Sequence, residues 1–224
     1  SDLGLIYGLK IANSFISSGE YKNIIVVGVD VHSRFVAWND RSTCVLFGDG
    51  AGALLLQRST DDQNDLLFVD IRSDSSKANE LKIPLSGNNC PLVEKNTKEA
   101  QHVKMNGREV YKFAVNYVPE SIKYVLKSLN YTVNDVDKYI LHQANIRIIQ
   151  AIADKLQEDI DKFYVNLHKY GNTSSASIAI ALTDAIEENK IDCPSTLVFS
   201  GFGAGLTWGT AVVRWRAKDM RKDA

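Results

Sequence analysis

The hydrophobic and polar positions near the start of the sequence follow two different periods. In residues 3–18, apolar side chains recur every three or four positions, and Gly19 comes directly afterwards. The apolar positions are Leu5, Leu9, Ala12 and Ile16. This period predicts an amphipathic α-helix that ends at the glycine. The next run, Ile24–Val29, is apolar throughout, which is typical of a strand buried on both faces of a parallel sheet.

The rest of the chain alternates predicted strands with predicted helices. The strands are expected at 53–56, 66–71, 138–141, 163–166, 196–199 and 208–215. The helices are expected at 106–129, with an interruption near Pro119, at 146–156 and at 174–188. Residues 57–65 are polar and suit a linker, and residues 73–103 form a long irregular segment. The alternation predicts an α/β protein.

One order of elements occurs twice. A helix, an apolar strand, a glycine cluster and a second strand make up residues 3–56, and the same order recurs over residues 173–215. The clusters are Gly48-Asp49-Gly50-Ala51-Gly52 and Gly201-Phe202-Gly203-Ala204-Gly205. The repetition predicts a duplicated α/β unit.

The glycine clusters do not indicate nucleotide binding. A strand follows each of them, whereas a dinucleotide fingerprint needs a helix whose N-terminus meets the pyrophosphate. The first cluster is predicted to be a tight turn between antiparallel strands. The second is predicted to be a turn whose backbone N–H groups could also bind an oxyanion.

The composition narrows the class of protein. The sequence has 224 residues, of which 45% are apolar, and 26 Lys+Arg stand against 27 Asp+Glu. The apolar fraction excludes a disordered chain, and the balanced charge excludes the basic excess of a typical nucleic-acid binder. Because no apolar run reaches the roughly 18 residues of a membrane helix, we expect a soluble, cytoplasmic protein with neither nucleic acid nor membrane as a partner.

Cys44, Cys90 and Cys193 are far apart, and no C-x-x-C pair is present. This spacing argues against a disulfide framework and against a zinc site, and it favours a reducing compartment. We expect neither a metal nor another cofactor. The sequence starts with Ser1 rather than Met, inside a predicted element, and we interpret the start as a cut edge.

Two polar motifs lie next to predicted helices. His142 directly follows the strand at 138–141, and ligands of open α/β sheets bind at such strand ends. Asn172 lies in a glycine-containing turn before a helix of small residues, where its simplest role is an N-cap. A single histidine is more often structural than catalytic, so the two motifs together carry more weight than either alone.

Six motifs occur together in a fixed order. They are Asp40-Arg41-x-Thr43, Phe47–Gly52, Met105-x-Gly107-x-Glu109-Val110, His142-Gln143-Ala144-Asn145, Gly171–Ser174 and Gly203-x-Gly205-Leu206-Thr207-Trp208-Gly209. This set resembles the β-ketoacyl-acyl-carrier-protein synthase III family of the thiolase superfamily over essentially the whole chain. The resemblance implies a five-layered αβαβα fold of two related halves. Residues 1–60 would be the remainder of the N-terminal half, and residues 61–224 the C-terminal half.

The resemblance also implies an activity and its residues. The family condenses an acyl-CoA primer with malonyl-acyl-carrier protein, with loss of carbon dioxide, to begin fatty-acid synthesis, and its members form homodimers. His142 and Asn172 would stabilise the enolate as hydrogen-bond donors, and the backbone N–H at Ala204 would bind the other oxyanion. The positions that match contacts to CoA or pantetheine are Arg41, Gly107, Asn145 and Arg147.

A basic surface is expected near the pocket because the carrier protein is acidic. Lys104, Arg108 and Lys112 are spaced by four residues, which on a helix would make one stripe. Arg147 and Lys155 would extend it from the next helix. The simpler interpretation of these charges is a solvated face.

The family's nucleophilic cysteine would fall at Asp2, and none of the three cysteines lies near a matching site. The resemblance also places part of the first domain before Ser1. A truncated or cleaved product, a partial gene sequence and one piece of a split enzyme with a complementary N-terminal chain all fit, and a synthase fragment is the favoured interpretation. The alternatives are a non-condensing partner subunit, a malonyl decarboxylase that lacks the cysteine, and, least favoured, an acyltransferase that uses Cys44.

Overall fold

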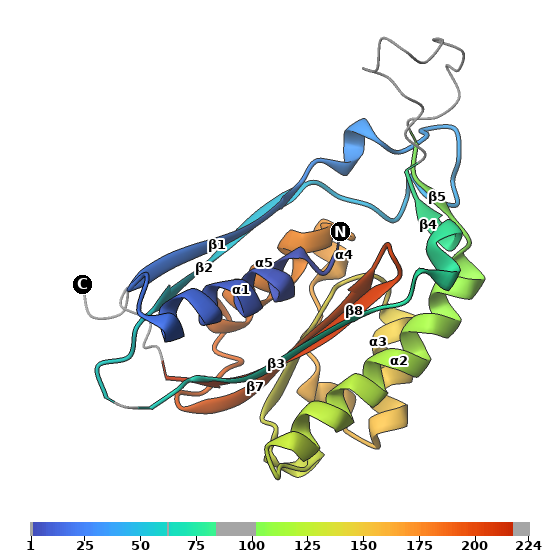
Figure 1. Cartoon of the computed structure of the whole chain (residues 1–224). Coiled ribbons are helices and arrows are strands. Elements are labelled where there is room, and N and C mark those ends of the chain that lie inside the picture. Colours follow the sequence, from blue (N-terminus) through green and yellow to red (C-terminus); the bar gives the residue numbers. More distant parts are fainter. Residues whose placement is uncertain (1, 62, 84–101, 217–224) are drawn as a thin grey trace.

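The computed structural model describes residues 2–61, 63–83 and 102–216, which form four layers (Figure 1). The first layer is a two-stranded sheet of β1 (Asn23–Asp30) and β2 (Gly50–Gln57). Helices α1 (Gly4–Ser18) and α5 (Ser177–Glu187) lie between it and a four-stranded sheet. Helices α2 (Gly107–Ser128) and α3 (Ile146–Leu156) cover the other face of that sheet. The described residues thus show four layers in the order β-α-β-α, and an outer helical layer beside β1 and β2, the fifth of the αβαβα arrangement that the resemblance implies, is not among them.

The four-stranded sheet has the order β3-β8-β7-β6. Its strands are β3 (Leu66–Ser73), β6 (Lys138–Leu141), β7 (Ser195–Gly203) and β8 (Thr207–Trp215). Only β6 and β7 run parallel, and the other two pairings are antiparallel. Both α1–β1–β2 and α5–β7–β8 are a helix followed by an antiparallel strand pair, as the repeated order of elements predicted.

The amphipathic pattern of α1 places its apolar side towards the core, where Leu5, Leu9 and Ala12 are buried. The helix ends as predicted at Gly19, which takes the left-handed conformation with φ of 82°. Glycine adopts this conformation without the strain that a Cβ causes, and the backbone N–H of Gly19 bonds the carbonyls of the last turn.

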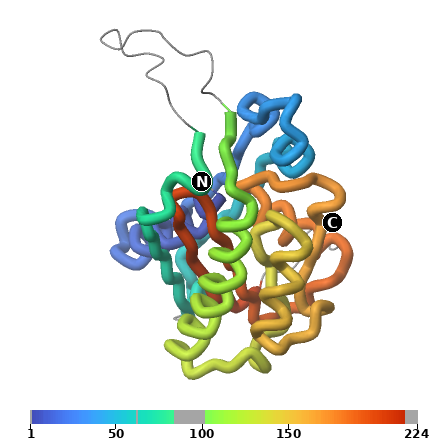
Figure 2. The backbone as a smooth tube through the Cα atoms, turned by 90° about the vertical axis from the view of Figure 1, so that its right-hand side faces the viewer, coloured from blue at the N-terminus to red at the C-terminus, as the bar shows by residue number. Residues whose placement is uncertain are grey.

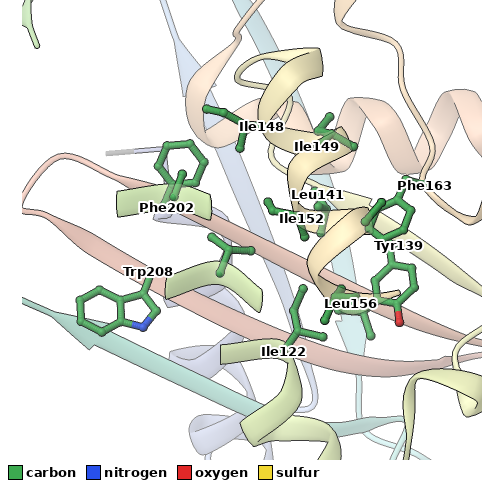
Figure 3. Close-up of a cluster of buried hydrophobic side chains, with 14 of the residues drawn as sticks. Ile122, Tyr139, Leu141, Ile148, Ile149, Ile152, Leu156, Phe163, Phe202 and Trp208 are labelled. Atoms are coloured by element: carbon green, nitrogen blue, oxygen red, sulfur yellow. The ribbon is translucent and has the colours of Figure 1, made fainter. Parts of the chain in front are cut away.

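A cluster of buried apolar side chains fills the space between the four-stranded sheet and the two helices that cover it, α2 and α3 (Figure 3). Figure 2 shows these two helices side by side. Helix α2 runs without a break through Pro119, so the predicted interruption is wrong. Proline removes one helical hydrogen bond, but α2 buries a long apolar face from Val110 to Leu126 against the sheet, and that packing holds the helix together.

The expectation of a fully buried parallel strand at Ile24–Val29 is also wrong. Strand β1 pairs antiparallel with β2, and its residues face alternate sides. Val26 is buried against α1, whereas Ile25, Val27 and Val29 are 65%, 59% and 57% exposed. Within the described ranges, one face of this two-stranded sheet is therefore apolar and uncovered.

The first glycine cluster is not a tight turn. The chain takes residues 31–49 to pass from β1 to β2, and the glycines lie at the start of β2. A Cβ at Gly48 would collide with the carbonyl of Tyr170, and one at Gly52 would lie 2.7 Å from Cβ of Ala179. Opposite Gly52, a Cβ at Gly28 would collide with the backbone of Ser175. The glycines let β1 and β2 approach the segment that carries Asn172 and the start of α5.

Residues 163–166 do not form the predicted strand. Phe163 makes a single bridge to Tyr139, on whose ring it stacks at 4.4 Å. The side chain of Gln143 then bonds the carbonyl of Tyr164 and the N–H of Asn166, so a side chain takes the place of a neighbouring strand. The chain continues into the short helix α4 (Leu167–Tyr170). No helix in the described part of the chain is long and apolar enough to cross a bilayer.

Candidate active site

A pocket of about 210 Å³ opens where β6 gives way to α3. It brings together five positions that the sequence singled out, which are Asp2, Gly107, His142, Asn145 and Asn172. Its other walls come from Ser42, Leu46, Phe47, Leu81, Met105, Val110, Tyr111, Ala144, Ile148 and Phe202. Since these residues come from distant parts of the sequence, only the fold assembles the pocket.

His142 follows the last residue of β6, at the carboxyl end of the parallel strand pair, as the sequence predicted. Its side chain is buried, and its backbone N–H bonds the carbonyl of Ser200 at 2.8 Å. The ring atom Nδ1 lies 2.7 Å from the hydroxyl of Ser177. The other ring nitrogen, Nε2, is buried and has no hydrogen-bond partner among the described residues. Burial lowers the pKa of the imidazole, so the ring is neutral near pH 7.

Asn172 is fixed in orientation by its neighbours. Its backbone forms two hydrogen bonds with the segment before β2. The N–H of Asn172 donates to the carbonyl of Leu46, and the carbonyl of Asn172 accepts the N–H of Gly48. The side-chain Oδ1 accepts the N–H of Ser174 at 2.8 Å, which satisfies the turn before α5 much as an N-cap would. Because the oxygen is engaged there, the NH₂ end of the amide is the end available to a ligand in the pocket.

Asp2 places a carboxylate in the same pocket. Its Oδ2 lies 3.8 Å from Nε2 of His142, and its Oδ1 accepts the hydroxyl of Ser174. Gly203 allows this approach, since a Cβ there would lie 3.0 Å from the backbone nitrogen of Asp2. The position that the resemblance assigned to the nucleophile therefore carries an acid within a few ångströms of His142.

The other predicted binding residues divide into two groups. Gly107 and Asn145 line the pocket, and Oδ1 of Asn145 also caps α3 by accepting the N–H of Arg147 at 2.8 Å. Arg41 and Arg147 are exposed and are not part of the pocket wall, although Ser42 next to Arg41 is. Ala204 lies in the turn between β7 and β8, directly after Gly203, and is likewise outside the wall.

The basic residues do not form the single helical stripe that their spacing predicted. Lys104 lies on β5 (Lys104–Met105), which pairs with β4 (Leu81–Lys82), while Arg108 and Lys112 lie on α2. Lys104 lies in a strand that ends before Asn106, the N-cap of α2, so the spacing of four residues does not place Lys104 on a helix face. Lys112 is paired with Glu109 at 2.8 Å, and Nζ of Lys155 donates to Oδ1 of Asn116 on α2.

No cysteine lines the pocket within the described ranges. Cys44 is partly buried in the turn after Arg41, Cys193 is exposed before β7, and Cys90 lies outside the described residues. The same ranges hold no group of three His, Cys, Asp or Glu side chains arranged to bind a metal ion.

The sequence reasoning missed several functional positions. Phe202 forms an apolar wall and directly precedes Gly203 of the second cluster, a position that could have identified it. Phe47, which begins the motif Phe47–Gly52, forms a further apolar wall, but no role was predicted for it. Ser174 and Ser177 hold Asp2 and His142, and both belong to the run of small residues after Asn172.

Two family models match this chain. The model described as 3-oxoacyl-[acyl-carrier-protein (ACP)] synthase III matches residues 3–75, and the model of its C-terminal part matches residues 126–215. This chain belongs to the 3-oxoacyl-[acyl-carrier-protein] synthase III family. The family is a group of transferases with the thiolase fold, and both matched regions contribute residues to the pocket.

Individual relatives in this synthase III family agree with the models. The chain is 46% identical to beta-ketoacyl-[acyl-carrier-protein] synthase III of Microcystis aeruginosa over 217 residues, which is 95% of this chain and 64% of that protein. The crystal structure of 3-oxoacyl-[acyl-carrier-protein] synthase III from Aquifex aeolicus superposes with a TM-score of 0.85 at 42% identity, over 96% of this chain and 65% of that one. The crystal structure of 3-oxoacyl-(acyl carrier protein) synthase III from Pseudomonas aeruginosa superposes with a TM-score of 0.88 at 34% identity, over 96% of this chain and 65% of that one. The chain thus spans about 65% of the length of these relatives.

Proposed function

We propose that this chain contributes the decarboxylative half-site of a β-ketoacyl-ACP synthase III, an acyltransferase that condenses an acyl-CoA primer with malonyl-ACP to begin fatty-acid synthesis. The observation that carries the proposal is the pairing of two donors in one pocket. His142 has an unpartnered buried Nε2, and Asn172 has its amide turned so that the NH₂ end is available.

The chemistry follows from where charge develops. When malonyl thioester loses carbon dioxide, the carbon–carbon bond breaks and its electron pair moves into an enolate, whose oxygen becomes negative. Two fixed donors in a pocket with apolar walls stabilise that oxygen more than water does, because they need no reorganisation. The enolate carbon then attacks the carbonyl of the acyl thioester and forms a carbon–carbon bond, and the carbon–sulfur bond breaks so that the sulfur leaves as a thiolate. Phe47, Phe202 and Ile148 supply apolar walls around this step.

The carboxylate of Asp2 favours a second candidate, decarboxylation without condensation. An acid at that position has no thiol to carry the acyl group, while the two enolate donors are present. Its charge would also oppose the malonyl carboxylate, since like charges a few ångströms apart repel. A non-condensing partner subunit is the third interpretation, and it predicts neither activity.

The test uses malonyl-ACP that carries ¹⁴C in its free carboxyl group. Release of labelled carbon dioxide is expected, and His142→Ala or Asn172→Ala should lower the rate by about 100-fold, as the loss of one oxyanion donor does in other enzymes. Absence of release from the wild-type protein would support the partner-subunit interpretation.

Asp2→Cys separates the two catalytic candidates. If only the missing thiol prevents condensation, this variant should accept a radiolabelled acetyl group from acetyl-CoA and form acetoacetyl-ACP. Asp2→Ala is the matched control, because it removes the charge without supplying a nucleophile. Acetyl transfer to the wild-type protein would instead show that another thiol, such as that of Cys44, serves the reaction.

We also propose that the active assembly covers the apolar outer face of β1 and β2, in a homodimer or with a complementary N-terminal chain. The exposure of Ile25, Val27, Val29 and Leu55 supports this, because a contiguous apolar patch of this kind marks an interaction surface. Sedimentation velocity over a range of concentrations tests it, and Val27→Glu should shift the equilibrium towards the monomer.

A further inference from the structure

Ser177 is the first residue of α5 and is buried, with 1% of its surface exposed. Its hydroxyl points towards His142. Its Oγ lies 2.7 Å from Nδ1 of His142 and also accepts the backbone N–H of Gln143 at 3.4 Å. No other acceptor is paired with this hydroxyl in the described part of the chain. The hydroxyl of Ser177 therefore donates its hydrogen bond to the lone pair of Nδ1.

The opposite arrangement is disfavoured. If Nδ1 carried the proton and donated to Ser177, the serine oxygen would accept two hydrogen bonds and its own buried proton would have no acceptor, which is costly inside a protein. The distal side of the ring gives the same result. Oδ2 of Asp2 lies 3.8 Å from Nε2, so a proton on Nε2 is attracted to the carboxylate, whereas a lone pair there would be repelled.

We propose that Ser177 is a positioning residue that holds His142 in the neutral tautomer with the proton on Nε2, so that the ring presents a donor to the pocket. The expected effect on the rate of carbon dioxide release rests on the proposed function. The tautomer itself does not, because it is a property of the resting protein. The ring orientation is set from three sides, by Ser177, by the bond from the His142 N–H to Ser200, and by Phe202, whose ring packs edge-on at 5.6 Å.

The first experiment reads the tautomer directly. In protein labelled with ¹⁵N-histidine, two-bond ¹H–¹⁵N correlations near neutral pH should show a protonated Nε2 and an unprotonated Nδ1 for His142. The signals are assigned by their disappearance in His142→Ala. A protonated Nδ1, or a doubly protonated ring, would overturn the proposal without any reference to activity.

The second experiment removes the hydroxyl. Ser177→Ala should convert the single tautomer into a mixture and lower carbon dioxide release from malonyl-ACP by about tenfold, the rate equivalent of one hydrogen bond. Ser195→Ala is the matched control, because Ser195 is also buried and its hydroxyl donates to the carbonyl of Asp192, at the opposite end of β7 from Ser200. It should leave the tautomer unchanged.

An unchanged tautomer in Ser177→Ala would refute the role of the serine. Ser177→Cys covers the case in which the alanine variant fails to fold, because its thiol is a weaker donor of similar size and should give an intermediate mixture. A wild-type protein that shows the Nε2–H tautomer but releases no carbon dioxide would contradict the proposed function and leave the assignment of the tautomer intact.

Discussion

At the scale of single residues, the site combines a buried imidazole with an acid and leaves one ring nitrogen unsatisfied. Nε2 of His142 has no hydrogen-bond partner among the described residues, although a buried polar atom without a hydrogen bond costs about 1–3 kcal/mol. Natural proteins retain such a cost where a ligand satisfies the atom during function. The unsatisfied nitrogen is therefore the strongest local indication that this pocket binds a hydrogen-bond acceptor.

Burial of His142 makes the stability of the protein depend on pH. Its pKa is lowered from the ordinary value of 6.5, so below about pH 6.5 the unfolded chain binds a proton that the folded chain excludes. The free energy of unfolding of the wild type should therefore fall on acidification. The His142→Gln variant lacks this imidazole, so its free energy of unfolding should rise relative to that of the wild type by at most about 1.4 kcal/mol for each unit that the pH is lowered. Urea unfolding between about pH 7.5 and 5 measures this difference, with the exposed His168→Gln as the control for loss of an imidazole. Parallel curves for wild type and His142→Gln would contradict the prediction.

At the scale of elements, hydrogen bonds at the N-terminal ends of helices hold two of the pocket residues in position. Asn145 caps α3, and Asn172 bonds the turn that leads into α5. The close approach of that turn to β1 is made possible by Gly28, where any larger residue would meet the backbone of Ser175. Helix starts and glycine contacts together place the side chains of three separate segments in one pocket.

The cap at Asn145 allows its structural and binding roles to be separated. Asn145→Ala should lower the free energy of unfolding by about 1 kcal/mol, because the N–H of Arg147 loses its acceptor, whereas Asn145→Asp keeps an acceptor at the helix N-terminus. Urea unfolding checks both. If Asn145 also contacts the substrate, KM should rise in both variants. A KM unchanged in the Asp variant would leave the residue with the capping role alone.

At the scale of the whole molecule, the net charge of −1 gives no general attraction for an acidic partner, so any attraction must be local. The described basic residues near the pocket come from a strand and two helices rather than one stripe. Lys112 is partly neutralised by Glu109, whereas the other four residues of the predicted docking set are exposed and form no ion pair in the described ranges; these are Lys104, Arg108, Arg147 and Lys155.

Charge reversal tests the docking surface. Lys104→Glu combined with Arg108→Glu should raise KM for the carrier protein by about tenfold and make it less sensitive to salt, while acyl-CoA binding is unchanged. Lys127→Glu, at the far end of α2, is the matched control on the same helix. Equal KM values for the double variant and this control would reject the surface.

The local elements and the chemistry of the motifs could be predicted from residues that are neighbours in the chain. The apolar period predicted α1 and α3, and the motif at His142 was placed correctly at the end of a strand, because these features depend on neighbours in the chain. The family followed from the order of six motifs.

The way in which these elements pack together depends on contacts between segments that are distant in the chain. A continuous apolar run looks the same in a parallel and an antiparallel strand, so the one-sided burial of β1 could not be read from Ile24–Val29. The glycines of the first cluster serve contacts with residues more than a hundred positions away, which no local pattern encodes. The same holds for the pairing of His142 with Ser177 and Asp2, because the hydrogen bond and the charge that set its donor state exist only once β6, α5 and the segment before α1 are packed together.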